Sequence, residues 1–279
     1  MQEKALPETA GKKLPPDRIT ILAQGPWADA AGVSDTGLVR RNNEDAIFVH
    51  HSASLLLLAD GMGGHQHGAQ ASHTALDVIS DRLNPETLPQ RLGEATVVLG
   101  LPVAVAGLCS LVQRAVAAAN NEVYKNNLSQ GLLRYSGTTV VGLVLLENGY
   151  LLFFHVGDSR LYRFRKGRLK ALTTDHSMHA EWLAAGRPGL EPGKQAITRA
   201  IGPHEFVEPE VGWDKWRKND IYLLCSDGLT DMVPEEGIKK GLASREPLEK
   251  MALHLVEKAC ESGGKDNISA IVCRMEQSG

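Results

Sequence analysis

Four aspartates stand where an apolar run of the sequence meets a turn. Asp60 ends the run LLLLAD, Asp158 follows YLLFFHV, and Asp227 follows IYLLC. Asp266 comes just before another such run, NISAIVC. A carboxylate beside a buried strand must be hydrated, paired or bound to a metal, because burying it alone costs several kcal/mol. Asp-Gly is also ordinary turn chemistry, so each of these positions taken alone is compatible with a simple turn.

The repetition of this pattern favours one common site over four unrelated turns. In an antiparallel sheet the end of one strand lies beside the start of its neighbour, so the four carboxylates can meet at one edge. Converging carboxylates repel one another unless cations neutralise them, and hard divalent ions bind carboxylate, carbonyl and water oxygens. The glycines after Asp60 would let a backbone carbonyl approach such an ion. Two ions about 3.5 to 4 Å apart can promote phosphoryl displacement, so the pattern predicts a metal-dependent phosphoester hydrolase.

A further acidic pair, Glu44 and Asp45, lies in the segment GLVRRNNEDAIFV. A solvated charged loop before a strand explains this segment equally well when it is considered alone. Beside a metal pair, one of the two preceding arginines would bind phosphate, because a guanidinium holds phosphate oxygens through two parallel hydrogen bonds. Arg40 and Arg41 are both candidates on this argument.

The remaining pattern predicts an α+β fold with a largely antiparallel sheet. Apolar residues recur with helical spacing in 69–83 and 247–260. The apolar stretch 97–112 is too short for a membrane span and contains Pro102, so we expect a buried helix entered near this proline and no membrane insertion. Short apolar or β-branched runs predict strands at 138–146, 150–156, 160–172, 220–225 and 267–273. The ENG between the first two runs and the KG within 160–172 are hairpin-like connections.

Composition narrows the functional classes. The chain has 279 residues, 43% of them hydrophobic, and a net charge of -3, which fits a globular domain and argues against nucleic acid as a partner. We expect residues 1–26 to form a flexible N-terminal extension and 27–279 a single catalytic domain. The four cysteines lack metal-ligand spacing and lie in apolar runs, which predicts reduced, buried thiols. Together with the absence of a secretory signal, this predicts a cytoplasmic protein.

Eight ordered blocks of the sequence resemble the bacterial branch of the type 2C, or PPM-class, protein serine/threonine phosphatases. They cover about residues 29–274 and read SDTGLVRRNNEDAIFV, LLADGMGGHQHGAQAS, SGTTVVG, HVGDSRLYRFRKGRL, LTTDHS, ITRAIG, LLCSDGLTDMV and GGKDNISAIV. The resemblance implies a β-sandwich of two antiparallel sheets flanked by helices on both sides. It implies hydrolysis of phosphoserine and phosphothreonine on proteins, with a bacterial serine/threonine kinase as the opposing enzyme. We also expect a monomer.

By motif position, the resemblance assigns roles at a centre of two Mn²⁺ or Mg²⁺ ions. Asp60 would bridge the two ions. The Gly61 carbonyl would bind one of them, and Glu44 would reach the same ion, often through water. Asp227 and Asp266 would bind the other ion.

The resemblance also implies a third, weaker ion that Asp158 helps to hold, and it makes Arg40 the phosphate-binding arginine in preference to Arg41. The implied mechanism is direct attack by a metal-bridging water, without a phosphoenzyme. Animal members place a histidine, proposed as the general acid, where this chain has Met62, whose thioether cannot donate a proton. The acid would then be a metal-bound water or His65, and we favour the water.

Residues 176–202 match the segment that forms a flap over the active site in relatives, and their Gly and Pro content equally suits a mobile surface loop. Two other functions stay open. One is a catalytically inactive, metal-bound regulatory domain, which the complete set of ligand positions disfavours. The other is a two-metal hydrolase of nucleic acid or small phosphodiesters, which the negative net charge and the absence of a basic aromatic groove disfavour.

Overall fold

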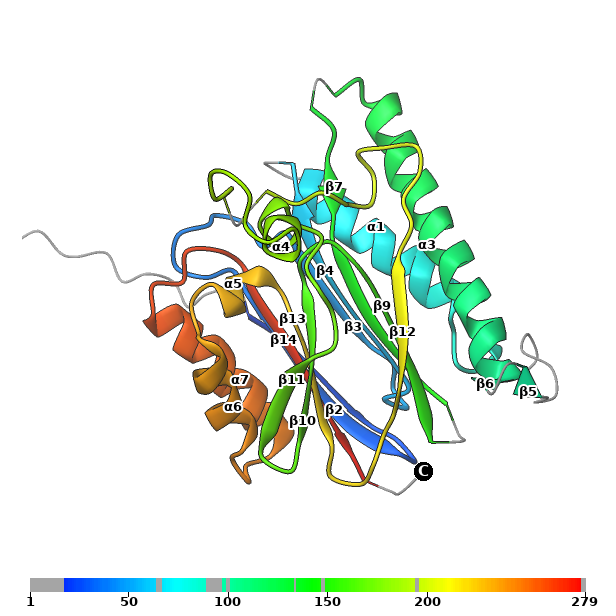
Figure 1. Cartoon of the computed structure of the whole chain (residues 1–279), viewed down its shortest axis with the longest axis vertical. Helices are drawn as coiled ribbons and strands as arrows, with labels where there is room; N and C mark the ends of the chain where they lie inside the picture. Colours follow the sequence, from blue (N-terminus) through cyan, green and yellow to red (C-terminus); the bar gives the residue numbers. More distant parts are fainter. Residues whose placement is uncertain are drawn as a thin grey trace, which may run out of the picture.

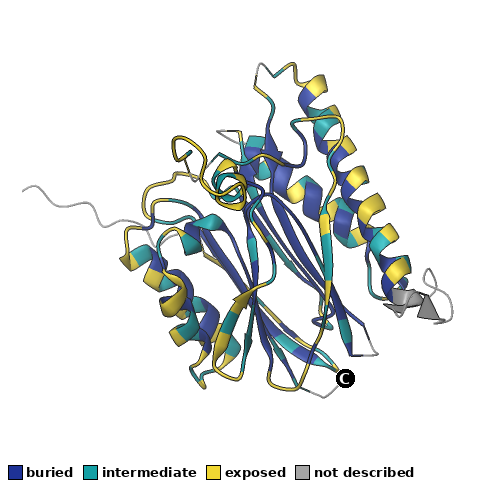
Figure 2. Cartoon of the chain, in the orientation of Figure 1, coloured by how far each residue is buried: buried dark blue, intermediate teal, exposed yellow. Residues whose placement is uncertain are grey.

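The computed structural model describes residues 18–63, 67–88, 97–98, 101–132, 134–146, 149–193 and 196–276. In these residues two antiparallel sheets pack face to face, and helices cover the outer face of each sheet (Figure 1). The central strands of both sheets are buried, whereas the edge strands are partly exposed and the helices turn exposed faces outward (Figure 2). This arrangement confirms the predicted sandwich of two antiparallel sheets between helical layers.

The first sheet is covered by the helices of the C-terminal part of the chain. Its strands follow the order β1 (Arg18–Gln24), β2 (Ala28–Asp35), β14 (Ile268–Met275), β13 (Ile221–Cys225), β10 (Arg160–Arg165) and β11 (Arg168–Ala171). The covering helices are α5 (Asp227–Thr230), α6 (Glu235–Leu242) and α7 (Leu248–Glu261). Helix α7 packs on β2 and β14, as its predicted apolar face over 247–260 requires.

The second sheet is covered by two longer helices. Its strands follow the order β12 (Glu210–Lys215), β9 (Tyr150–Val156), β8 (Val140–Leu145), β4 (Leu55–Met62) and β3 (Asp45–Val49), and β7 (Gly137–Thr138) pairs with the end of β4. Helix α1 (His67–Arg82) packs on β4, and α3 (Val103–Ser129) packs on α1 and β9. A small ribbon, β5 (Val97–Val98) with β6 (Leu101–Pro102), precedes α3.

The run of four leucines in β4 is buried on both faces of the strand. Leu55 and Leu57 pack toward the helical layer, whereas Leu56 and Leu58 pack between the two sheets. Side chains of a strand point alternately to opposite faces. A central strand with helices on one side and a second sheet on the other therefore needs an apolar residue at every position, and this requirement explains the absence of a polar alternation.

The predicted hairpins and helices are present with small shifts. β8 pairs with β9, and β10 pairs with β11 across the KG at which a hairpin was predicted within 160–172. Helix α3 begins directly after Pro102, and Val105, Leu108 and Val112 are buried on its inner face. None of the helices in the described part of the chain combines the length and apolar composition that a membrane span requires.

One predicted boundary is wrong. We expected a flexible extension through residue 26, but β1 pairs along its whole length with β2, from Arg18 opposite Asp35 to Gln24 opposite Asp29. Most residues of β1 are exposed because it is the edge strand of its sheet, so it lacks the apolar pattern by which a buried strand is recognised. Residues 1–17 of the predicted extension lie outside the described residues.

Candidate active site at the edge of the sandwich

All the predicted site residues line one cavity of about 250 Å³ at the edge of the sandwich. Asp60 lies in β4 of the second sheet, and Asp158 follows β9 of that sheet in the turn to β10. Asp227 follows β13 of the first sheet as the first residue of α5, and Asp266 precedes β14 of that sheet. The four aspartates therefore meet across two sheets that face each other, rather than along the edge of one sheet as the sequence suggested. The predicted residues on the cavity wall are Arg40, Glu44, Asp60, Gly61, Asp158, Asp227 and Asp266.

The strand order explains this convergence. β4 and β9 flank β8 and are both antiparallel to it, so Asp60 in β4 and Asp158 after β9 reach the same edge. In the opposite sheet β13 ends just before Asp227, and β14 begins just after Asp266; these two strands are also antiparallel neighbours. Asp60 does not end its strand, because β4 continues through Met62, where it pairs with β7.

Glycines make room for Glu44 and for the backbone beside Asp60. The Gly61 N–H donates to the Glu44 carbonyl at 3.1 Å, which holds β4 against the segment before β3. A Cβ atom added to Gly68, near the start of α1, would meet the Glu44 carboxylate, and one added to Gly61 would meet the Gly68 carbonyl. Only glycine lets these three segments approach so closely.

The cavity concentrates negative charge that the protein itself does not balance. Burial, followed by repulsion from neighbouring carboxylates, raises the pKa of Asp60 well above its usual value. The same causes raise the pKa of Asp158 to about 7 and that of Asp227 to about 6. Buried carboxylates that repel one another at neutral pH are suited to divalent cations, whose preferred ligands are oxygens. The donor set therefore fits Mn²⁺ or Mg²⁺.

Arg40 is the single arginine among the described residues that line this cavity. Its Nη2 atom lies 2.7 Å from Asp266 Oδ2, and its side chain is 54% exposed, so the guanidinium borders both the acidic cavity and solvent. Arg41 is exposed and does not line the cavity. Of the two candidate arginines, the structure therefore places Arg40 at this cavity.

Asp45 is a buried carboxylate for which the sequence pattern predicts no role. It lies opposite Asp60 in the register of β3 and β4. Its Oδ2 atom accepts hydrogen bonds from Ser226 at 2.9 Å and Ser269 at 2.6 Å, while its Oδ1 atom is buried without a partner among the described residues. Burial raises the pKa of Asp45 to about 7 despite these bonds. Asp45 joins the two sheets directly behind the cavity.

Two further residues position the acidic side chains. Thr139 Oγ1 accepts the Asp60 N–H at 3.0 Å, and the Thr139 N–H donates to the Asp60 carbonyl at 2.9 Å. Asn267 Oδ1 accepts the Glu44 N–H at 2.8 Å, and its Nδ2 atom donates to the carbonyls of Thr36 and Asn42. Both residues belong to family-like blocks of the sequence, SGTTVVG and GGKDNISAIV, but only the fold shows what they contact.

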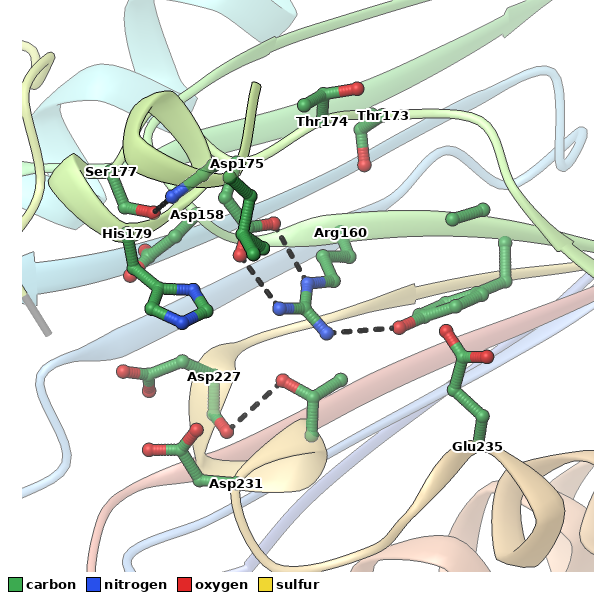
Figure 3. Close-up of a pocket in the computed structure, with 15 residues that line it drawn as sticks. Asp158, Arg160, Thr173, Thr174, Asp175, Ser177, His179, Asp227, Asp231 and Glu235 are labelled. Atoms are coloured by element: carbon green, nitrogen blue, oxygen red, sulfur yellow. Dashed lines mark hydrogen bonds and ion pairs between the residues drawn. The ribbon is translucent and has the colours of Figure 1, made fainter. Parts of the chain in front are cut away.

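A second cavity of about 350 Å³ adjoins the first, and Asp158 and Asp227 line both. Figure 3 shows its wall, where Arg160 points between Asp175 and a tyrosine. Arg160 binds Asp175 through two hydrogen bonds of 2.7 and 2.6 Å. Helix α4 (Met178–Ala184) contributes side chains from the side opposite α5. Two connected cavities thus share the Asp158 carboxylate.

The predicted flap contacts the site through Ile197, which lines the first cavity. The segment is held by backbone hydrogen bonds from Met178 to Ala196 and from Thr198 to His176, both of 2.8 Å. Met62 lines the first cavity as well. His65, the alternative general acid, lies outside the described residues.

Fold and cavity together define the class of protein: an α-β-β-α sandwich whose carboxylates gather at one edge, in an arrangement that suits divalent cations. The chain belongs to the protein phosphatase 2C family, whose model matches residues 39–260. It is a protein serine/threonine phosphatase, and its relatives act on phosphorylated proteins.

Two bacterial relatives illustrate the similarity. The serine/threonine phosphatase stp of Listeria monocytogenes is 32% identical over 247 residues, which are 86% of this chain and 92% of that protein. The serine/threonine protein phosphatase PstP of Mycobacterium tuberculosis is 35% identical over 247 residues, which are 87% of this chain and 44% of that protein.

Solved structures agree with the fold described above. The crystal structure of Mycobacterium tuberculosis PstP/Ppp matches with a TM-score of 0.77 and 33% identity, covering 90% of this chain and all of that one. The catalytic domain of PstP in complex with two manganese ions matches with a TM-score of 0.74 over 90% of this chain and 99% of that one. A relative that holds two manganese ions supports metal dependence in this phosphatase.

Proposed function

We propose that this phosphatase removes phosphate from phosphoserine and phosphothreonine on proteins by direct attack of water, without a phosphoenzyme. The proposal rests mainly on one observation: carboxylates from separate segments of both sheets share a single cavity with one arginine. This arrangement supports a centre for two tightly bound Mn²⁺ or Mg²⁺ ions. Bound there, the ions would neutralise the carboxylates and activate water for in-line attack on phosphorus.

We assign the two-ion centre to the residues that meet across the sheets. Asp60 would bridge the ions, with Asp227 and Asp266 at one side and Glu44 and the Gly61 carbonyl at the other. The close approach of β4 to the start of α1 supports the placement of a backbone carbonyl here, because only glycine leaves that space.

Arg40 would bind the phosphate group of the substrate. Its guanidinium is half exposed and lies at the rim of the acidic cavity, which suits a side chain that must reach an incoming anion. A guanidinium presents paired N–H donors to phosphate oxygens, so this residue would orient the phosphorus and stabilise its negative charge.

Asp158 would hold a third, weaker ion between the two cavities, and the leaving group would receive its proton on that side. A serine or threonine alkoxide is a poor leaving group, so a positioned acid contributes about 10²- to 10⁴-fold, whereas p-nitrophenolate hardly needs one. Asp158→Ala should therefore slow a phosphothreonine peptide far more than p-nitrophenyl phosphate. If His65→Ala has this selective effect instead, the proton comes from the histidine.

Three substrates test the reaction class. With Mn²⁺, the full chain should hydrolyse p-nitrophenyl phosphate and a phosphothreonine peptide, and leave bis-p-nitrophenyl phosphate intact. Asp60→Asn and Asp227→Asn should abolish both activities. Full activity of either variant at saturating Mn²⁺ would contradict the two-ion centre, and preference for the diester would indicate a phosphodiesterase.

We further propose that the enzyme opposes a bacterial serine/threonine kinase in the cytoplasm and acts as a monomer. Its curated relatives are serine/threonine phosphatases of bacteria, and all four cysteines are free thiols, which suits a reducing compartment. A phosphoproteome compared with and without the protein would identify the kinase targets. Light scattering of the purified chain would test the monomer.

A further inference from the structure

The block LTTDHS is packed against the loop that presents Asp158. It lies between β11 and α4, and three of its polar residues, Asp175, His176 and Ser177, have separate partners. Asp175 binds Arg160, as Figure 3 shows, and Ser177 Oγ accepts the Ala180 N–H at the start of α4. The third of these residues, His176, has no role in the function proposed above. It is 6% exposed, so its ring must be accommodated inside the protein.

His176 binds both backbone polar groups of Gly157, the residue before Asp158. Its N–H donates to the Gly157 carbonyl at 3.0 Å, and its ring Nδ1 atom accepts the Gly157 N–H at 3.1 Å. The Gly157 carbonyl belongs to the peptide plane from which Asp158 departs, since that plane also contains the Asp158 nitrogen. His176 therefore fixes the orientation of the backbone that aims the Asp158 carboxylate.

The bend at Gly157 needs such support because its conformation is unusual. Its φ is +100°, and a Cβ atom there would lie 2.6 Å from Thr139 Cγ2. Thr139 is also the residue that hydrogen-bonds the Asp60 backbone. The position of the Gly157 turn is thus defined on one side by Thr139, which is hydrogen-bonded to the Asp60 backbone, and on the other by His176.

The opposite side of His176 faces the predicted flap. Its carbonyl accepts the Thr198 N–H at 2.8 Å, and its Nε2 atom lies 3.4 Å from an Arg199 Nη1 atom and 3.5 Å from a Glu210 Oε2 atom. Burial, followed by the nearby Arg199, lowers the pKa of His176, which keeps Nδ1 free to accept. With Nδ1 as acceptor, the proton of the neutral ring is on Nε2 and is directed toward Glu210.

The neighbouring His155 offers an alternative role as a metal ligand, which the geometry disfavours. His155, His176 and Glu210 are close enough together to hold an ion, and both ring nitrogens of His155 lack hydrogen-bond partners among the described residues. However, the two rings are stacked, with centroids 4.3 Å apart and planes 16° apart. The lone pairs lie in the ring planes, so stacked rings do not direct them at one ion. The Gly157 N–H, moreover, already occupies Nδ1 of His176.

We propose that His176 is a positioning residue, which holds the Gly157–Asp158 turn so that Asp158 can bind the third divalent ion. This inference rests on the function proposed above, in which Asp158 holds that ion. Partners that orient a metal ligand commonly contribute 10- to 100-fold to metal affinity. Substitution of His176 should therefore lower the affinity for the weakest ion and leave the affinities of the two tight sites unchanged.

Three substitutions separate the roles of the two ring nitrogens. In His176→Asn the Oδ1 atom takes the place of Nδ1 and can accept the Gly157 N–H. In His176→Gln the amide extends toward the place of Nε2, and His176→Leu removes both polar atoms. The Mn²⁺ affinity of the weakest site is measured by calorimetric titration of the metal-free full chain. His176→Gln and His176→Leu should lower this affinity at least tenfold, whereas in His176→Asn it should stay within about threefold of wild type.

Asp158→Ala is the reference variant and should abolish the weakest site. If it does so while His176→Gln and His176→Leu bind Mn²⁺ like wild type, the inference is wrong and the proposed function stands. If Asp158→Ala leaves all Mn²⁺ sites intact, the third-ion assignment fails and the inference fails with it. Equal losses of Mn²⁺ affinity in His176→Asn, His176→Gln and His176→Leu would contradict the inference and leave His176 a packing role. Binding of Zn²⁺ that requires His155 would also contradict it and favour a metal site at His155, His176 and Glu210.

Discussion

The charge of Asp158 should destabilise the metal-free protein, so removing that charge should stabilise it. Asp158 is 9% exposed, and burial followed by the nearby Asp227 raises its pKa from 3.8 to about 7. At roughly 1.4 kcal/mol for each pH unit, this pKa shift means that the ionised Asp158 side chain lowers the free energy of unfolding by at most about 4 kcal/mol. Water penetration and the joint titration of neighbouring carboxyls reduce this cost, so we expect the Asp158 charge to destabilise the metal-free protein by about 1 to 3 kcal/mol.

The sign of the pH dependence follows from the direction of the shift. Below about pH 4 the carboxyl is protonated in the folded and unfolded states, so it costs nothing. Between about pH 4 and pH 7 the unfolded chain releases the proton first, and the free energy of unfolding therefore falls as the pH rises. Above pH 7 the cost is complete. Asp158→Asn should thus be more stable than wild type at pH 8 and similar to it at pH 4.5.

Urea unfolding of EDTA-treated protein, followed by circular dichroism at both pH values, measures the difference. Asp35→Asn is the matched control, because Asp35 is also buried but has an Arg18 partner at 2.8 Å and accepts the Gly37 N–H at 2.8 Å. Loss of these charge-assisted bonds should cost roughly 1.5 to 3 kcal/mol at pH 8. A less stable Asp158→Asn protein at pH 8 would refute the reasoning. Added Mn²⁺ should reverse the order, since wild type gains more from the ion.

Three further predictions concern the same edge of the sandwich. In steady-state assays, Arg40→Ala should raise the KM for a phosphothreonine peptide roughly 10-fold or more while kcat changes less. Arg41→Ala should leave KM and kcat within about twofold of wild type. The reverse ranking would assign the phosphate-binding role to Arg41 instead of Arg40. Gly157→Ala should lower the free energy of unfolding by roughly 2 to 5 kcal/mol because of its +100° φ and the contact with Thr139, whereas Gly167→Ala, at +76° φ in open space, should cost about 1 to 2 kcal/mol in the same denaturation assay. EDTA should abolish peptide hydrolysis and Mn²⁺ should restore it, as a phosphate-release assay would record; activity that persists in EDTA would contradict metal dependence.

The local pattern of the sequence was sufficient for the elements that position the site. Apolar runs with hairpin turns predicted β8, β9, β10 and β11, and helical periodicity predicted α1 and α7. The same runs located the aspartates, because a charged residue directly after a buried strand is conspicuous in any sequence. These features depend only on neighbouring residues, and no long-range contact is needed to recognise them.

Edge strands and the two-sheet architecture could not be derived from local pattern alone. β1 is largely exposed, and β12 lies at the edge of its sheet, so neither presents a buried apolar face. The four leucines of β4 are compatible with any element buried on all sides. Only the packing of helices on one face and a second sheet on the other explains them. Family resemblance supplied the sandwich that periodicity left undetermined.

The closest contacts of the site were decided by the tertiary structure. Glu44 and Asp45 are adjacent in the sequence, yet Glu44 lines the cavity and Asp45 is buried behind it between two serines. His176 lies 19 positions from Gly157 in the sequence and nevertheless binds its backbone N–H. Spacing along the chain reports which side chains alternate or share a helical face. Which of them meet depends on how the two sheets pack, and the carboxylates of this phosphatase come together only through that packing.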